Sequence, residues 1–97
     1  MLIERRTKIK NTNGLHARPA TRFAEMANKF NSEIFVKTKN KEEVNGKSII
    51  DLLTLGAKRG TELLITADGD DKELALDALE GLVNDRFNED NMETRKG

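Results

Sequence analysis

The sequence contains no cysteine, tryptophan or tyrosine, and its 97 residues include one histidine and one proline. Without cysteine there is no disulfide, no thiol nucleophile and no cysteine-bound zinc. A single histidine argues against a transition-metal site, and we predict no metal and no cofactor. Four phenylalanines offer little surface for stacking bases, and 17 basic residues balance 17 acidic ones. Both features argue against a nucleic-acid partner.

Long hydrophobic runs are also missing from the sequence. No stretch approaches the roughly 20 apolar residues that cross a membrane, and the N-terminus lacks the apolar segment of a signal peptide. We therefore expect a monomeric, cytoplasmic protein without membrane insertion. The length suits one domain, since domains commonly have about 100–150 residues. We predict that this domain covers residues 1–87 and that the polar residues 88–97 form a disordered tail.

Hydrophobic periodicity predicts an alternation of strands and helices. Near the N-terminus, Ile3, Thr7 and Ile9 lie on one side of an alternating segment, as in a half-exposed strand. After Pro19, apolar residues recur every three or four positions, as on one face of a helix. This order predicts an α+β fold, an open-faced β-sandwich with three helices on one face of a four-stranded, mostly antiparallel sheet. The expected strands are about Leu2–Lys10, Glu33–Lys37, Glu42–Val44 and Thr61–Thr66, and the expected helices about Ala17–Lys29, Ser48–Leu55 and Lys72–Arg86.

The histidine, the proline and an arginine fall within four positions, His16 to Pro19. Proline suits the first turn of a helix, which predicts that the helix begins at about Ala17 with His16 near its N-cap. The backbone N–H groups of Ala17 and Arg18 then have no intrahelical partner and attract an anion. The Arg18 guanidinium matches phosphate oxygens. Together these groups indicate a histidine that accepts a phosphoryl group, although an ordinary histidine beside a helix cap is the alternative.

A second segment of interest begins at Ser48. The serine followed by Asp51 three positions later resembles a capping box, which predicts that Ser48 caps a short helix. That helix carries more apolar residues than one face can bury. We assign Leu52 and Leu55 to the core and expect an exposed patch, which we call the docking patch, beside His16. It consists of Ile49, Ile50 and Leu53. Arg22, one turn beyond Arg18, is predicted to be a solvated surface residue.

Two motifs resemble those of the histidine-containing phosphocarrier (HPr) family of the bacterial phosphoenolpyruvate-dependent phosphotransferase system. Gly14–Ala20, with the sequence GLHARPA, resembles the family's active-site motif, and Gly46–Ile50 resembles its regulatory-serine motif, with Leu55–Gly56 at the family's spacing. The resemblance implies that His16 accepts a phosphoryl group on Nδ1 from enzyme I. It further implies that permease acceptor domains receive the group, that the docking patch contacts these partners, and that the protein is a carrier and not an enzyme.

The resemblance also implies a regulatory role for Ser48, through ATP-dependent phosphorylation by a serine kinase/phosphorylase. Phosphate at a helix N-terminus is compatible with the capping role. An alternative is therefore a regulatory module of the same family that acts through Ser48 or in a nitrogen-type branch of the system. His16 argues against the family variants that have lost the histidine.

Overall fold

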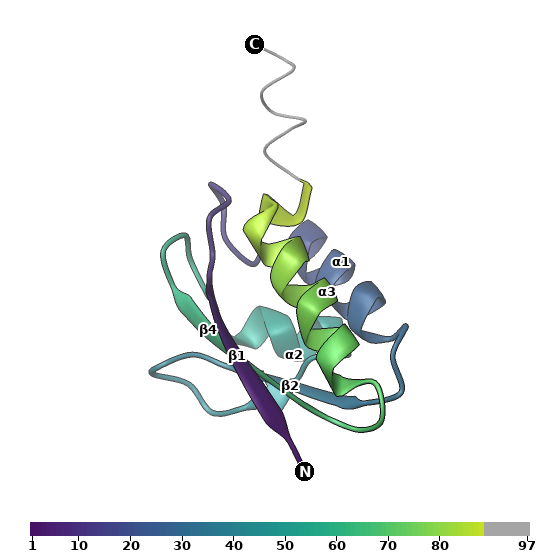
Figure 1. Ribbon diagram of the computed structural model, residues 1–97. Helices are drawn as coiled ribbons and strands as arrows, with labels where there is room; N and C mark the ends of the chain where they lie inside the picture. The colour runs from purple at the N-terminus through teal and green to yellow at the C-terminus, as the bar shows by residue number, and fades with distance from the viewer. Residues whose placement is uncertain (89–97) are drawn as a thin grey trace.

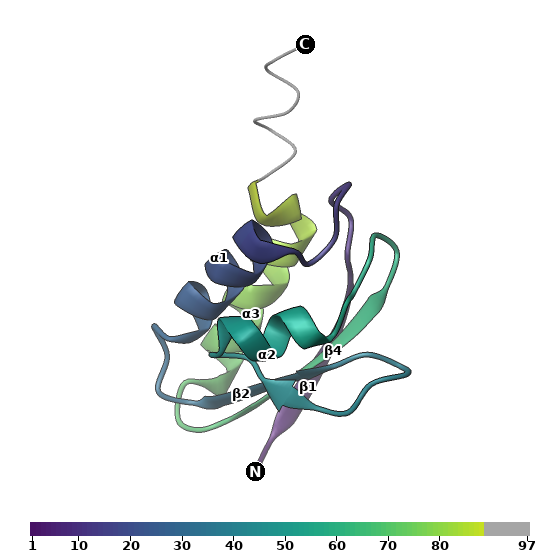
Figure 2. The same cartoon turned by 180° about the vertical axis from the view of Figure 1, so that it is seen from behind.

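The computed structural model describes residues 1–88 and contains four strands, three α-helices and a short 3₁₀ turn. Figures 1 and 2 show the helices together on one side of the sheet. This arrangement confirms the predicted α+β open-faced sandwich. In chain order, the elements are β1 (Ile3–Lys8), α1 (Ala17–Ala27), β2 (Glu33–Lys37), β3 (Val44–Asn45), α2 (Ile49–Thr54), β4 (Glu62–Asp68), α3 (Lys72–Asn84) and η1 (Arg86–Asn88).

All three strand pairings in the sheet are antiparallel, in the order β1-β4-β2-β3. The central strand β4 pairs Leu64 with Arg6 of β1 on one side and with Lys37 of β2 on the other. Residues of β4 with the opposite parity, Leu63 and Ile65, are buried beneath the helices. Side chains on a strand alternate between the two faces. One face of the sheet therefore forms half of the core, and the other is open.

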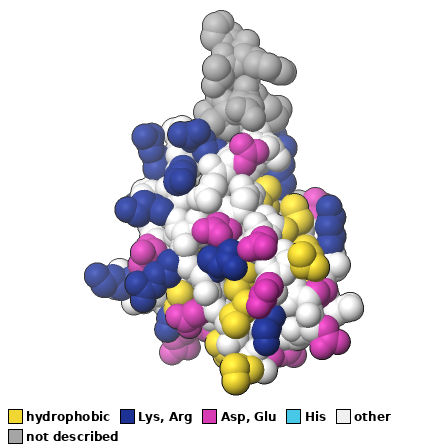
Figure 3. Space-filling view, in the orientation of Figure 1, with side chains coloured by type: hydrophobic (Ala, Val, Ile, Leu, Met, Phe, Trp, Pro, Cys, Tyr) yellow, Lys and Arg dark blue, Asp and Glu magenta, His cyan; other side chains and the backbone are white. Residues whose placement is uncertain are grey.

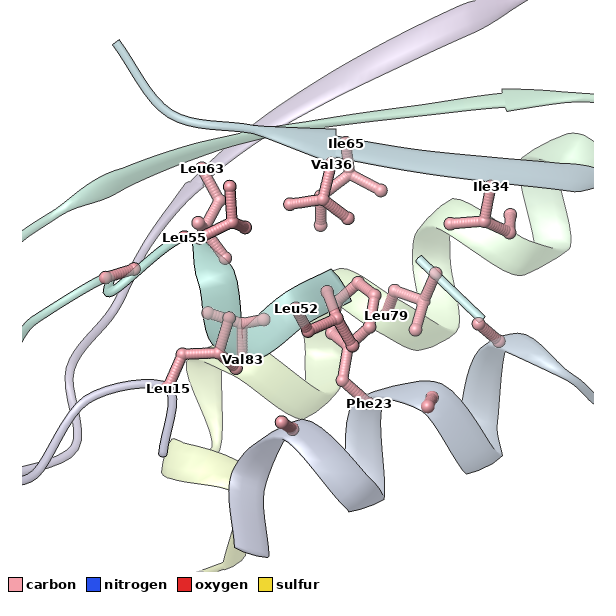
Figure 4. Packing of buried hydrophobic residues seen from close by; sticks show 14 of the residues in the cluster. Leu15, Phe23, Ile34, Val36, Leu52, Leu55, Leu63, Ile65, Leu79 and Val83 are labelled. Atoms are coloured by element: carbon pink, nitrogen blue, oxygen red, sulfur yellow. The ribbon is translucent and has the colours of Figure 1, made fainter. Parts of the chain in front are cut away.

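The core lies between the sheet and the three helices (Figure 4). Phe23 of α1, Leu52 of α2 and Leu79 of α3 are fully buried together with Val36 and Ile65 of the sheet. Ala20, Ala24 and Ala27 are buried as well, in agreement with the spacing of three and four that predicted α1. Small residues on α1 let its neighbours approach closely, and they fix this helix against the rest of the domain.

Several predicted element ends are wrong by one or two residues. Helix α1 ends at Ala27, where Asn28 donates a side-chain hydrogen bond to the Ala24 carbonyl at 2.8 Å. Helix α3 ends at Asn84, two residues before the predicted end, because residues 86–88 have positive φ and cannot continue a right-handed helix. Strand β3 lies at Val44–Asn45, a little beyond the predicted Glu42–Val44.

Phe87 is fully buried, although sequence reasoning placed it only at the border of a polar tail. Asn88, the first residue of the predicted disordered tail, is the last residue of η1. The predicted disordered tail otherwise lies outside the described residues.

Two polar clusters join elements far apart in the sequence. Arg5 of β1 donates to Asp77 at 2.9 Å and to Glu80 at 2.7 Å, both on α3. Hydrogen bonding to Glu80, and then to Asp77, raises the pKa of the Arg5 guanidinium. At the other end of α3, Asp71 accepts hydrogen bonds from both the hydroxyl and the backbone N–H of Ser32. These clusters fasten α3 to β1 and to the turn that precedes β2.

The Asp71 carboxylate also accepts the backbone N–H of Asn31 at 2.8 Å. The Ser32 hydroxyl bond and then the Asn31 N–H bond lower the pKa of Asp71, because they favour its charged form. Asp71 is the N-cap residue of α3, but its side chain makes no capping bond to that helix. It holds the preceding turn instead.

Candidate functional site

The site begins at the N-terminus of α1, where the structure confirms the predicted helix start. His16 is the N-cap residue, with extended backbone angles, and its carbonyl accepts the N–H of Ala20 at 2.9 Å. Its side chain makes no capping hydrogen bond to the helix. The imidazole is therefore not used as a cap, and the N–H groups of Ala17 and Arg18 have no acceptor within the helix. His16 is half-buried, whereas Ala17 and Arg18 are exposed.

Two hydrogen bonds hold the loop before His16 in place. The buried side chain of Asn11 donates to the Gly14 carbonyl at 2.8 Å, and Gly14 has a φ of +73°. Leu15 is buried, and its N–H donates to the carbonyl of Ala57 at 2.8 Å. Asn11 was not singled out from the sequence. An asparagine at the start of a turn can bond the backbone ahead of it, which is the signal that could have identified it.

Pro19 and the two arginines of α1 have different surroundings. Pro19 is buried in the first turn, as its predicted role at the helix start requires. Arg18 is exposed and forms no ion pair among the described residues, so its guanidinium is available to an anion at the helix end. The prediction for Arg22 was wrong. Arg22 is half-buried and donates to the Phe87 carbonyl, because η1, which follows α3, packs against α1.

The second segment confirms that Ser48 caps a helix. Ser48 is the N-cap residue of α2, and its hydroxyl oxygen accepts the N–H of Asp51 at 3.1 Å. The capping box is only half formed, since the Asp51 carboxylate accepts the N–H of Asn45 at 3.3 Å and not that of Ser48. The segment just before α2 is also tied to the turn after α1, because the Lys47 side chain donates to the Phe30 carbonyl at 2.8 Å.

The docking patch is exposed as predicted. Ile50 is 74% exposed, Ile49 38% and Leu53 40%, whereas Leu52 and Leu55 of the same segment are buried. Figure 2 shows α1 and α2 on the same side of the sheet. The loop that follows α2 is joined to the His16 loop through the hydrogen bond from Leu15 to Ala57. An apolar surface therefore lies on the helix next to the one that begins at His16.

Two negative findings apply to residues 1–88. They hold no group of three or more histidine, cysteine or acidic side chains arranged to bind a metal ion. None of their helices is both long enough and apolar enough to span a membrane.

A family model described as "PTS HPr component phosphorylation site" matches residues 3–85 of the chain. The HPr phosphocarrier protein of Neisseria meningitidis is 42% identical over 88 residues, which cover 91% of this chain and 98% of that protein. The HPr-like protein Crh of Bacillus subtilis is 36% identical over 84 residues, or 87% of this chain and 98% of the relative. Among solved structures, HPr from Thermoanaerobacter tengcongensis has a TM-score of 0.84 and 45% identity, and the match covers 90% of this chain and 97% of that one.

The family model spans nearly all of the described residues, and the alignment with the Neisseria meningitidis protein covers nearly the whole of that relative. The fold, the helix that starts at His16 and the capped Ser48 agree with this match. The chain belongs to the HPr family of phosphocarrier proteins of the phosphotransferase system.

Proposed function

We propose that His16 is the residue that carries the phosphoryl group. The observation that supports this most directly is its position as the N-cap of α1 with a side chain that does not cap the helix. A phosphoryl group on this imidazole would lie next to the N–H groups of Ala17 and Arg18 and the positive end of the helix dipole. The guanidinium of Arg18 would supply further donors for its oxygens.

The same geometry suits temporary storage of the group. The site stands at a helix end on a small domain, with the exposed Ala17 and Arg18 beside the imidazole, so that two partners can reach it in turn. Few donors stabilise the phosphoryl group, and moderate stabilisation permits onward transfer. We therefore propose that the chain is a carrier and not an enzyme, and that each transfer is completed in the active site of its partner.

Family membership implies partners within the phosphotransferase system, such as enzyme I. We propose that enzyme I donates the phosphoryl group and that acceptor domains of sugar permeases receive it, both by contact with the docking patch. A cytoplasmic location and a monomeric state are parts of this proposal. A dimer of the Thermoanaerobacter tengcongensis protein has been solved, so the mass of this chain in solution is a separate test.

A regulatory role through Ser48 is the second candidate. It is supported by the position of Ser48 at the N-terminus of α2 and by the similarity to the HPr-like protein Crh. A serine kinase/phosphorylase would place a phosphate there, beside the exposed docking patch. If His16 is phosphorylated, this role exists beside phosphoryl carriage. If His16 is not phosphorylated, it replaces phosphoryl carriage.

A relay reconstituted with labelled phosphoenolpyruvate, enzyme I, the chain and a permease acceptor domain separates the two candidates. If the chain is a carrier, the label passes through it and appears on the acceptor domain, and omission of the chain stops the transfer. A purely regulatory module would take no label from phosphoenolpyruvate. It would gain an acid-stable phosphate only from ATP and a serine kinase.

A further inference from the structure

A cleft of about 520 Å³ borders the loop that precedes His16, because its lining residue Ala57 accepts the Leu15 N–H, but none of residues 14–18 lines it. The proposed carrier reaction does not use this cleft. Four segments form it: the end of β1 at Lys8, the hairpin around residues 38–41, the loop around residues 55–57 and the start of β4 around residues 60–62. Its volume falls within the range of small-molecule sites, which is about 300–1,000 Å³. Gly56 and Gly60 line it with open space beside them, so their backbone is accessible from the cleft.

The charged side chains around this cleft are mostly basic. Lys8, Lys39 and Lys41 line it, and Glu62 is the one acidic residue that does so. Figure 3 shows basic side chains gathered along the left edge of the molecule, where these loops lie in Figure 1. This concentration is notable in a chain whose formal net charge is zero.

Three of the six other lysines in residues 1–88 have hydrogen-bond partners for their ammonium groups, and the three cleft lysines do not. Lys10, Lys47 and Lys72 each donate a hydrogen bond to a described residue. Within residues 1–88, no hydrogen bond or ion pair engages the ammonium groups of the three lysines around the cleft. Glu62 lies opposite Lys8 in the register of β1 and β4 and offsets part of the positive charge, and an anion in the cleft would offset the remainder.

The basic surface continues onto the open face of the sheet. A neighbouring hollow of about 280 Å³ shares Thr38, Lys39 and Glu62 with the cleft and adds Arg6 and Lys37. Arg6 and Lys37 stand on either side of Leu64, their common partner in the register of β4. Thr38, which lines both hollows, is 7% exposed, and its hydroxyl makes no hydrogen bond to a described residue.

We propose that this cleft binds a small polyanion, a molecule that carries at least two phosphate or carboxylate groups. Lysine binds phosphate as a point charge, so the separated lysines suit separate anionic groups on one ligand. The Thr38 hydroxyl provides a hydrogen-bond donor near Lys39. Leu55 and Ala57 also line the cleft but are almost fully buried, so the ligand would be held mainly through its charged groups. The site requires no phosphoryl group on His16.

Titration with inorganic pyrophosphate, followed through the backbone amide spectrum of the isotope-labelled chain in low-salt buffer, tests the proposal. We expect saturable shifts centred on Thr38, Gly56 and Gly60. Lys39→Gln should weaken binding by about two- to fivefold, the range of one exposed ion pair. Glu62→Gln removes the opposing charge and should strengthen binding by a similar factor.

Lys29→Gln is the matched control, because Lys29 is exposed and does not line the cleft. It changes the net charge as Lys39→Gln does and should leave pyrophosphate affinity unchanged. Equal weakening by both variants would reduce the effect to net charge and overturn the proposal. Shifts centred on Ala17 and Arg18 would show that the anion binds at the His16 site. An absence of shifts would show that the cleft does not bind a small polyanion and would favour an acidic protein surface as the partner of the lysines. Either result would also overturn it.

Discussion

Gly14 lies so close to Ala57 that a Cβ atom on Gly14 would stand 2.5 Å from the Ala57 carbonyl oxygen. The same oxygen accepts the N–H of Leu15 at 2.8 Å. The loop after α2 thus packs directly against the loop that carries His16. This close contact leaves no room for a side chain at position 14. The contact joins the motif that contains His16 to the loop that directly follows Leu55–Gly56.

Gly14→Ala should therefore destabilise the domain and slow phosphoryl transfer to His16. The left-handed conformation alone costs a residue with a Cβ about 1–2 kcal/mol, and the contact with Ala57 adds to it. Gly60→Ala is the control, because Gly60 also has positive φ but a Cβ atom there would meet nothing within 4 Å. Urea unfolding and transfer rates from enzyme I are the measurements. A Gly14→Ala protein no less stable than Gly60→Ala would show that the contact does not constrain the loop.

Asp71→Asn should lower the melting temperature at neutral pH, because the carboxylate accepts three hydrogen bonds from Asn31 and Ser32. The pKa of Asp71 is lowered in the folded state. Its contribution is therefore present above the unfolded pKa of about 3.9 and is lost as pH falls through the lower folded value. The melting temperatures of the wild type and Asp71→Asn should converge in strong acid.

Asp70→Asn is the control for this titration, since Asp70 is exposed and makes no hydrogen bond to a described residue. It should melt like the wild type at every pH. A difference between wild type and Asp71→Asn that stays constant into strong acid would mean that charge on Asp71 does not stabilise the fold.

Ile50→Asp should weaken binding to enzyme I and to permease acceptor domains together, because both are proposed to use the docking patch. A central contact of an interface is worth about 2 kcal/mol or more on truncation. The melting temperature should hardly change, since Ile50 is 74% exposed. Leu74→Asp makes the same kind of change at a 66% exposed position on α3 and should leave both affinities intact. Calorimetry would measure the affinity of each variant for each partner. Equal affinities of Ile50→Asp and Leu74→Asp would contradict the shared docking patch.

Ser48→Ala and Ser48→Asp should affect different properties. Alanine removes the hydroxyl that accepts the Asp51 N–H, and loss of such a cap costs about 0.5–2 kcal/mol of stability. Aspartate keeps a capping oxygen but adds charge beside the docking patch. It should leave stability nearly unchanged and weaken binding to enzyme I, because docking must desolvate the new charge.

Phosphate on Ser48 carries about −1.5 to −2 charges and should act in the same direction more strongly. Backbone amide spectra of the Ser48→Asp protein should change only around α2. Unchanged affinity for enzyme I, or spectra altered throughout the domain, would contradict this electrostatic explanation.

Local signals in the sequence were sufficient for the start of α1 and for α2. Pro19 and the apolar spacing after it determine where α1 begins, and Ser48 with Asp51 determines the cap of α2. The division of α2 into buried Leu52 and exposed Ile50 also followed from the width of one helical face. Each of these features depends on residues within one or two turns of one another.

The features that were missed depend on distant partners. Arg5 has the parity of the buried face of β1, but its acidic partners Asp77 and Glu80 come from the far end of the chain. Arg22 is held by the carbonyl of Phe87 for the same reason. No local pattern shows that the chain turns back after α3 and buries Phe87. The cleft likewise could not be predicted from the sequence, because its lysines come together only when four separate segments of the chain meet.

The claim that His16 carries the phosphoryl group is tested most directly by mass spectrometry after incubation with enzyme I and phosphoenolpyruvate. We predict that the wild type gains one acid-labile phosphoryl group that fragmentation assigns to His16. His16→Gln, shown by its amide spectrum to be folded, should gain none. A His16→Gln protein that still acquired an acid-labile phosphoryl group from enzyme I, or a wild-type group assigned to another residue, would contradict the account.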